Sequence, residues 1–71
     1  MFKNYRSIIV SEKTPIVKVM EKINSVGSRI ALVVDDKEKL IGVATDGDIR
    51  RTLIDGHSSD ENILIAMNSL P

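Results

Sequence analysis

Two short apolar segments close together in the sequence constrain the fold most strongly. Residues 30–34 read Ile-Ala-Leu-Val-Val, and residues 40–45 read Leu-Ile-Gly-Val-Ala-Thr. Such runs are typical of β-strands, and the continuous run 30–34 is expected to be covered on both faces. The five polar residues between them, 35–39, have the length of a hairpin connection, and Gly42 predicts a bulge or a close approach of another segment. Because two central strands do not form an independent sheet, we expect a partner.

A helix is predicted before this pair of strands. Apolar residues recur over residues 16–26 with the spacing of one helical face. Thr14-Pro15 is a start signal, because Thr can cap a helix and Pro is tolerated at the first helical position. Gly27 lies where a left-handed C-terminal cap is expected. Residues 7–10 form an apolar patch ahead of this helix, and we expect them to be extended.

Two further helices are predicted after the strands. Thr45 or Asp46 is expected to cap a helix that runs to about Asp55. Residues 58–61, Ser-Ser-Asp-Glu, have the spacing of a capping box and predict a short third helix over 58–67.

Composition excludes several classes of protein. The chain has 71 residues, no Cys and one His, which excludes disulfides, thiolate metal sites and Cys nucleophiles. A domain this small is marginally stable alone, so self-association is the expected source of extra stability. Ten basic residues balance ten acidic ones, and there are two aromatic residues, so no nucleic-acid partner is expected. Without a long apolar run or a signal peptide, we expect no membrane partner and a cytoplasmic location.

The segment after the second strand carries the residues best suited to bind a ligand. It lies where a strand ends and a helix begins, and the unpaired N–H groups and dipole of a helix start favour an anion. Thr45 has a hydroxyl for a phosphate oxygen, and Gly47 lets the backbone approach a ligand closely. Asp48 has two acceptor oxygens that match two neighbouring hydroxyls of a ribose. Arg50 or Arg51 would add positive charge to a phosphate site.

The same residues also have a purely structural interpretation. Thr and Asp at a helix start are what N-terminal capping requires, and acidic residues in a first turn need no ligand. Asp46-Gly47-Asp48 has an Asp-x-Asp pattern, but the further oxygen ligands of a Mg²⁺ or Mn²⁺ site are missing, so we predict no metal. His57 is expected in a solvated loop without a Ser or Cys partner. We therefore predict no catalytic residues in this chain.

Residues 30–35 and 40–49, taken together, resemble a CBS motif, the module named after cystathionine β-synthase. The resemblance implies an α+β fold in which a small sheet packs against helices in the order β-α-β-β-α. It covers a core of about residues 7–56 within a single motif of residues 1–71, and the short helix 58–67 would lead toward a missing second motif. The Thr-x-x-Asp signature of the family falls on Thr45 and Asp48.

The resemblance is closest to CBS modules attached to sugar-phosphate nucleotidyltransferases and sugar-phosphate isomerases. In those modules a Thr-Asp-Gly-Asp run is commonly followed by two Arg residues, as in residues 45–51 here. Residues 67–71, Met-Asn-Ser-Leu-Pro, resemble the entry to a second motif. The likeness implies an amino-terminal piece of a longer regulated enzyme.

Members of the family work in pairs whose sheets stack and open two clefts, which commonly take AMP, ADP, ATP or S-adenosylmethionine. The resemblance therefore implies a regulatory nucleotide, with no required cofactor, and a second motif or a two-fold homodimer as the protein partner. It also assigns roles by position. Thr45 would face phosphate, Asp48 the ribose, Ser7 and Ile8 the base, and Arg29, Ile30 and Val43 would complete the wall.

Three hypotheses for function follow. The first is a regulatory module in which a nucleotide shifts the relative orientation of two copies, so that an attached domain responds. The second is a structural dimerisation module without a ligand. The third is an enzyme acting on sugar phosphates, which the short length and the missing catalytic pair argue against.

Overall fold

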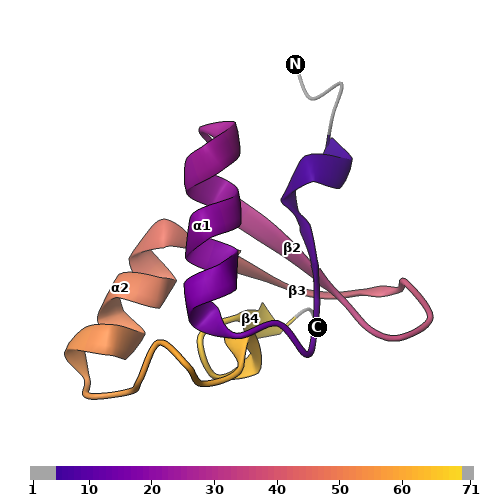
Figure 1. Ribbon diagram of the computed structural model, residues 1–71. Helices are drawn as coiled ribbons and strands as arrows, with labels where there is room; N and C mark the ends of the chain where they lie inside the picture. The colour runs from indigo at the N-terminus through magenta and orange to yellow at the C-terminus, as the bar shows by residue number, and fades with distance from the viewer. Residues whose placement is uncertain (1–4, 70–71) are drawn as a thin grey trace.

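The computed structural model describes residues 5–69 and has the expected order of strand, helix, strand, strand, helix (Figure 1). These elements are β1 (Ile9–Ser11), α1 (Ile16–Val26), β2 (Ile30–Val34), β3 (Leu40–Thr45) and α2 (Asp46–Ile54). Three short elements complete the described chain: the 3-10 turns η1 (Tyr5–Ile8) and η2 (Ile63–Ile65), and the two-residue strand β4 (Asn68–Ser69). Leu70 and Pro71, part of the predicted entry to a second motif, lie outside the described residues.

The four strands form one mixed sheet in the order β1-β2-β3-β4. β1 runs parallel to β2, which requires a crossover, and α1 is that crossover. β2 and β3 form the predicted antiparallel hairpin, and β4 pairs antiparallel with the other edge of β3. The architecture is the predicted α+β class.

The hydrophobic core lies between one face of this sheet and the helices, and Figure 1 shows α1 crossing in front of the strands. Side chains alternate between the faces of a strand, so Ala31 and Val33 of β2 and Ala44 of β3 point to the same side. The residues buried against them come from α1, α2 and η2: Ile16, Val19, Ile23, Ile49 and Ile63. This core holds both helices on one face.

The opposite face of the sheet is apolar and remains half exposed in the single chain. The side chains of Ile9, Ile30, Leu32, Val34 and Val43 are neither buried nor fully exposed. We call these five residues the outer sheet face. The prediction that β2 is covered on both faces is therefore met on one face only, because this chain supplies no second layer among residues 5–69.

Helix α1 begins one residue later than its start signal suggested. Pro15 is the N-cap and Thr14 makes no side-chain cap, because main-chain carbonyls of a distant loop take that role. The N–H of Ile16 donates to Glu61 O at 2.8 Å, and the N–H of Val17 donates to Ser59 O at 2.9 Å. At the other end, Gly27 adopts the predicted left-handed conformation with φ 71°.

The structure has both features that Gly42 predicted as alternatives, a bulge and the close approach of another segment. The register between β2 and β3 shifts at Val33 and Val34, opposite this part of β3. A Cβ at Gly42 would lie 2.6 Å from Met67 Sδ and 2.8 Å from Asn68 O, so only glycine leaves room for the segment that follows η2.

Two predicted elements differ from the structure. Ser7 and Ile8 belong to the 3-10 turn η1, and only from Ile9 is the chain extended as expected. The helix predicted over 58–67 is absent, and a turn followed by η2 takes its place. The Glu61 side chain does accept from the Ser58 N–H at 2.7 Å.

The reason the helix stops there is competition for main-chain groups. The carbonyls of Ser59 and Glu61 accept the first N–H groups of α1, and the N–H of Ile63 donates to Thr14 O at 2.9 Å. These groups would be needed for the i to i−4 bonds of a helix over 58–67. Tertiary contacts therefore override the local capping pattern.

Candidate functional site

One end of the sheet gathers several of the residues that the sequence singled out. Ile30 starts β2 and is the partner of Thr45, which ends β3 and is followed at once by α2. The N–H of Asp46 donates to Arg29 O at 2.8 Å, so the chain before β2 is tied to the first turn of α2. Ser7 and Ile8 precede β1, whose Ile9 lies beside Leu32 in parallel register. They therefore lie toward the same end of the sheet.

Thr45 and Asp48 cap the N-terminus of α2 reciprocally. Thr45 Oγ1 accepts from the Asp48 N–H at 3.0 Å, and Asp48 Oδ2 accepts from the Thr45 N–H at 3.1 Å. This is a capping box with Asp in the third helical position. The structural interpretation of these two residues is therefore confirmed, and a ligand contact would have to be compatible with it.

The Asp48 carboxylate has two more donors. Asn68 Nδ2 donates to Oδ2 at 2.6 Å, and Arg51 Nη2 donates to Oδ1 at 2.5 Å. The side chain is 11% exposed. Hydrogen bonding with the Thr45 side chain, then with its main-chain N–H, lowers the pKa of Asp48 below 3.8, and Arg51 adds a smaller effect in the same direction. Asp48 is therefore ionised at neutral pH.

The two arginines expected near a phosphate pair with acidic residues of their own helix. Arg50 Nη2 lies 2.7 Å from Asp46 Oδ2, and Arg51 bonds Asp48. Both guanidinium groups are mostly exposed. The Arg50–Asp46 pair is exposed at both partners and contributes little to stability, so Arg50 can leave Asp46 at small cost, whereas Arg51 pairs with the largely buried Asp48.

The remaining predicted residues divide between the two sides of the sheet. Ile30 and Val43 belong to the outer sheet face, together with the strand position of Thr45. Ile8 is only 5% exposed and is part of the interior. Ser7 is half-buried in η1.

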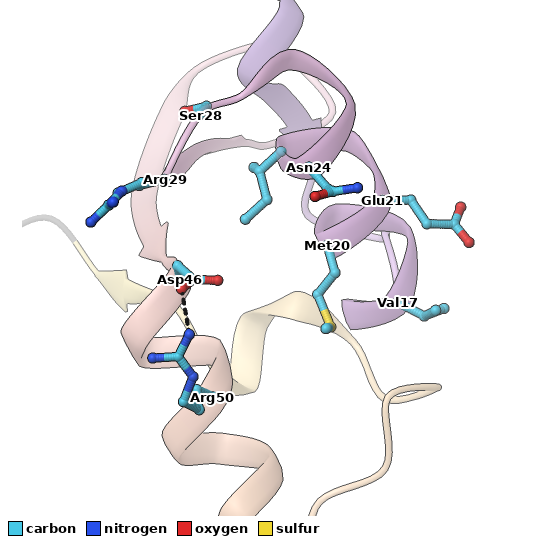
Figure 2. Close-up of a pocket in the computed structure, with 9 residues that line it drawn as sticks. Val17, Met20, Glu21, Asn24, Ser28, Arg29, Asp46 and Arg50 are labelled. Atoms are coloured by element: carbon cyan, nitrogen blue, oxygen red, sulfur yellow. Dashed lines mark hydrogen bonds and ion pairs between the residues drawn. The ribbon is translucent and has the colours of Figure 1, made fainter.

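Arg29 lines a groove of about 670 Å³ between α1 and the start of α2. Figure 2 shows Asp46 between Arg29 and Arg50, with the side chains of α1 across the groove. Within residues 5–69, the Arg29 guanidinium makes no hydrogen bond or ion pair, which leaves it available to an anion. The groove is lined by Val17, Met20, Glu21, Ile23, Asn24, Ser28, Arg29, Asp46 and Arg50.

The sequence did not indicate Asn68, which contacts the signature residue Asp48. Asn68 lies 20 residues from Asp48 and reaches it because β4 pairs with β3, placing Asn68 opposite Val43. No local pattern marks a two-residue strand, so the only available signal was Gly42, which predicted a close neighbour of unknown identity.

Residues 5–69 contain neither a cluster of metal-ligating side chains nor a membrane-spanning helix. Among residues 5–69, no three His, Cys, Asp or Glu side chains are placed to share a metal ion. No helix in that part of the chain is long and apolar enough to cross a lipid bilayer.

The fold and the capped helix start define a small β-α-β-β-α module of the kind that the Thr-x-x-Asp signature suggested. The CBS domain family model matches residues 3–55. The chain therefore belongs to the CBS domain family. No curated protein matches its sequence.

Solved structures of CBS proteins have the same fold. A CBS domain protein from Pyrobaculum aerophilum, complexed with AMP, superposes with a TM-score of 0.81 at 17% identity, covering 87% of this chain and 49% of that one. The CBS-domain containing protein from Agrobacterium tumefaciens gives 0.82 at 14% identity, covering 89% and 48%. This chain thus spans about half the length of both.

A third solved structure has a similar length. It is a cystathionine β-synthase domain protein fused to a Zn-ribbon-like domain, with a TM-score of 0.81 and 21% identity, covering 90% of this chain and 93% of that one.

Proposed function

We propose that this chain is a regulatory module that binds an adenine nucleotide (AMP, ADP or ATP) where β3 passes into α2. The observation that carries the proposal is the pairing of Ile30 with Thr45, which puts an apolar strand start beside a helix N-terminus and the ionised Asp48. A base needs apolar surface, a phosphate needs N–H donors, and a ribose needs paired acceptors. The AMP complex of the Pyrobaculum aerophilum protein supports this choice of ligand.

The phosphate would bind at the first turn of α2, beside the Thr45 hydroxyl. Two N–H groups of this turn already have acceptors, since Asp46 donates to Arg29 O and Asp48 donates to Thr45 Oγ1. The Gly47 N–H has no acceptor among residues 5–69, so it is the donor that remains. Arg29, whose guanidinium is unpaired there, would lie on the groove side of the site.

The ribose and the base would lie toward the outer sheet face. Asp48 would accept the ribose hydroxyls, and Val43 and Ile30 would supply apolar surface to the base. Ser7 and Ile8 of η1 would lie beside the base. The Ile8 side chain is only 5% exposed, so Ile8 would contact the base through its main chain. No cofactor is required for this role.

A second CBS motif or a second copy of this chain would cover the outer sheet face. The five residues of that face are apolar and half exposed, and an apolar sheet face of this kind is stabilised by burial. A two-fold arrangement would place the same surface of each copy against the other and would form a cleft at each end.

We further propose that the module is the amino-terminal part of a sugar-phosphate nucleotidyltransferase-type enzyme. The support is the resemblance of residues 45–51 to CBS modules of such enzymes. A nucleotide bound between two motifs would shift their relative orientation, and the attached catalytic domain would respond. The coding sequence beyond Pro71 tests this proposal directly, because it must contain a second motif and a nucleotidyltransferase domain.

The alternative is a structural dimerisation module without a ligand. One observation favours it: the protein's own groups occupy Thr45 and Asp48, the two signature residues, as a helix cap. This alternative predicts self-association through the outer sheet face and no response to any nucleotide.

Isothermal titration calorimetry with AMP, ADP and ATP distinguishes the two. Nucleotide binding predicts heat and a rise in Tm with at least one of the three, and substitution of Val43 by Asp, which puts a charge beside the base, abolishes both. CTP serves as the control for the base. Absence of heat and of any Tm shift at millimolar AMP, ADP and ATP would reject the regulatory proposal for this domain and leave the structural role.

A further inference from the structure

The segment after η2 packs directly on the edge of the candidate site. Asn68 pairs with Val43 and Ser69 with Gly42 in the antiparallel β3–β4 ladder. The missing side chain at Gly42 makes this possible, because a Cβ there would lie 2.8 Å from Asn68 O. The result is that Asn68 Nδ2 reaches Asp48 Oδ2 at 2.6 Å, which we call the Asn68 contact.

The Asn68 contact uses acceptor capacity that a ribose would need. A carboxylate has about four lone-pair sites, two on each oxygen. Both sites of Oδ2 are occupied, one by the Thr45 N–H and one by Asn68, whereas Oδ1 receives only Arg51. If two ribose hydroxyls donate one to each oxygen, the hydroxyl at Oδ1 finds an open lone-pair site. The hydroxyl at Oδ2 finds both sites occupied.

Among the two donors to Oδ2, Asn68 is the one that can leave. The Thr45 N–H is a main-chain group fixed at the start of α2 and belongs to the capping box. Asn68 is an exposed side chain on a two-residue strand, and it takes no part in the cap. Its amide can exchange Asp48 for water without leaving a buried group unpaired.

We propose that Asn68 competes with the ribose hydroxyls for Asp48, so that nucleotide binding releases the Asn68 contact and loosens residues 67–69. This inference rests on the proposed nucleotide site and adds its means of regulation. Residues 63–66 remain anchored through the buried side chains of Ile63 and Ala66, so the change is confined to Met67 and β4. Occupancy of the site is thereby transmitted along the chain toward whatever follows β4.

The thermodynamic consequence is reciprocal. If the nucleotide and the Asn68 contact exclude each other, removal of the contact must tighten nucleotide binding by the same factor by which the nucleotide disfavours the contact. Asn68 is exposed to water, so loss of this competing hydrogen bond predicts an increase in affinity of about three- to tenfold, the range of an ordinary surface hydrogen bond. The increase must depend on the ribose hydroxyls, because they are the groups that replace Asn68.

The test compares Asn68→Ala with Ser69→Ala, an exposed neighbour on the same strand, by calorimetry with AMP and with 2′,3′-dideoxy-AMP, which lacks both ribose hydroxyls. We expect Asn68→Ala to bind AMP about three- to tenfold more tightly than wild type and to leave the affinity for 2′,3′-dideoxy-AMP unchanged. Ser69→Ala should match wild type with both nucleotides. Circular dichroism of each variant establishes that it is folded. Amide exchange at residues 67–69 should quicken when wild-type protein is saturated with AMP.

The outcomes distinguish failure of the Asn68 competition from failure of the proposed nucleotide site. If AMP binds wild type and Asn68→Ala equally, or binds Asn68→Ala more weakly, the competition is wrong while the nucleotide site stands. If neither protein binds AMP, ADP or ATP at millimolar concentration, the proposed function fails and the competition fails with it. If only Asn68→Ala binds, both are supported, and the Asn68 contact keeps the wild-type site closed.

Discussion

Thr45 and Asp48 exchange hydrogen bonds at the start of α2, with Asp48 N to Thr45 Oγ1 at 3.0 Å and Thr45 N to Asp48 Oδ2 at 3.1 Å. The two residues that carry the family signature are thus also the cap of the helix that would receive the phosphate. Stability and ligand binding share the same atoms, so a variant of either residue changes both. An experiment on Thr45 or Asp48 must therefore measure the stability of the domain and its affinity for the nucleotide separately.

Removal of the Thr45 hydroxyl should destabilise the domain. Thr45→Ala leaves the Asp48 N–H without its acceptor, and the expected loss is about 1 kcal/mol in the free energy of unfolding, within a range of about 0.5–2 kcal/mol. Urea denaturation measures it. Thr45→Ser keeps the oxygen and should remain close to wild type. Equal midpoints for wild type and Thr45→Ala would contradict the capping box.

The contribution of Asp48 to stability should depend on pH. Its pKa in the folded protein is below the ordinary 3.8, so the stabilisation is complete above that value and is lost as the pH falls through the lower, folded pKa. Asp48→Asn cannot ionise. The difference in unfolding free energy between wild type and Asp48→Asn should therefore stay constant from about pH 7 to about pH 5 and shrink below about pH 4. A difference that grows on acidification would show that the sign of the pKa shift is wrong.

Gly47→Ala should separate folding from binding. A Cβ at this position meets only ordinary contacts, 3.5 Å from Arg51 Nη1 and 3.9 Å from Thr45 Oγ1. The substitution should raise the unfolding free energy by about 0.5–1 kcal/mol, because alanine is the better helix residue. The new methyl group beside the Gly47 N–H should also weaken AMP binding about tenfold. Calorimetry and urea denaturation on the same sample measure both, and unchanged affinity would place the phosphate elsewhere.

Gly42→Ala should be among the costly substitutions. Its Cβ would lie 2.6 Å from Met67 Sδ and 2.8 Å from Asn68 O, and overpacking of this kind costs about 1–3 kcal/mol. Adding Met67→Ala should recover only part of the loss, since the Asn68 carbonyl remains in the way. Thermal unfolding of the single and double variants tests this. Full recovery in the double variant would mean that β4 does not approach Gly42 as closely as described.

The outer sheet face should mediate self-association. Leu32→Lys introduces a charge at the centre of that face, and burying it unpaired should weaken a dimer by about 100-fold or more. Ile54→Lys is the matched control, because Ile54 is 75% exposed at the end of α2, outside the outer sheet face. Sedimentation equilibrium compares the two. A wild-type monomer at high concentration, or a dimer unaffected by Leu32→Lys, would argue against this interface.

Much of the fold could be predicted from local patterns. The strands at 30–34 and 40–45, the helix at 16–26 and the cap at Gly27 all agree with the structure. Each depends on a repeat of side chains or on the conformation of one glycine, and both act within a few residues. A cap at Thr45 or Asp46 was predicted for the same reason, and the structure has Thr45 as the N-cap.

The third helix was predicted wrongly because its capping pattern is local and its competitor is not. Residues 58–61 have a suitable sequence, but their carbonyls accept the first N–H groups of α1. A sequence pattern contains no information on which distant donors will arrive. The contact of Asn68 with Asp48 was not predicted for the same reason, because the two residues are 20 positions apart in the sequence.

The sequence by itself determined the order of the elements, a helix start at Thr45 or Asp46, and the close approach of another segment to Gly42. The tertiary structure alone decided that β4 is the segment beside Gly42 and that distant carbonyls accept the first N–H groups of α1. It also decided how many donors the Asp48 carboxylate accepts from. The physical reason is the range of the forces involved. Backbone conformation and side-chain periodicity act over one or two turns, whereas hydrogen bonds between distant segments exist only after the hydrophobic core has brought those segments together.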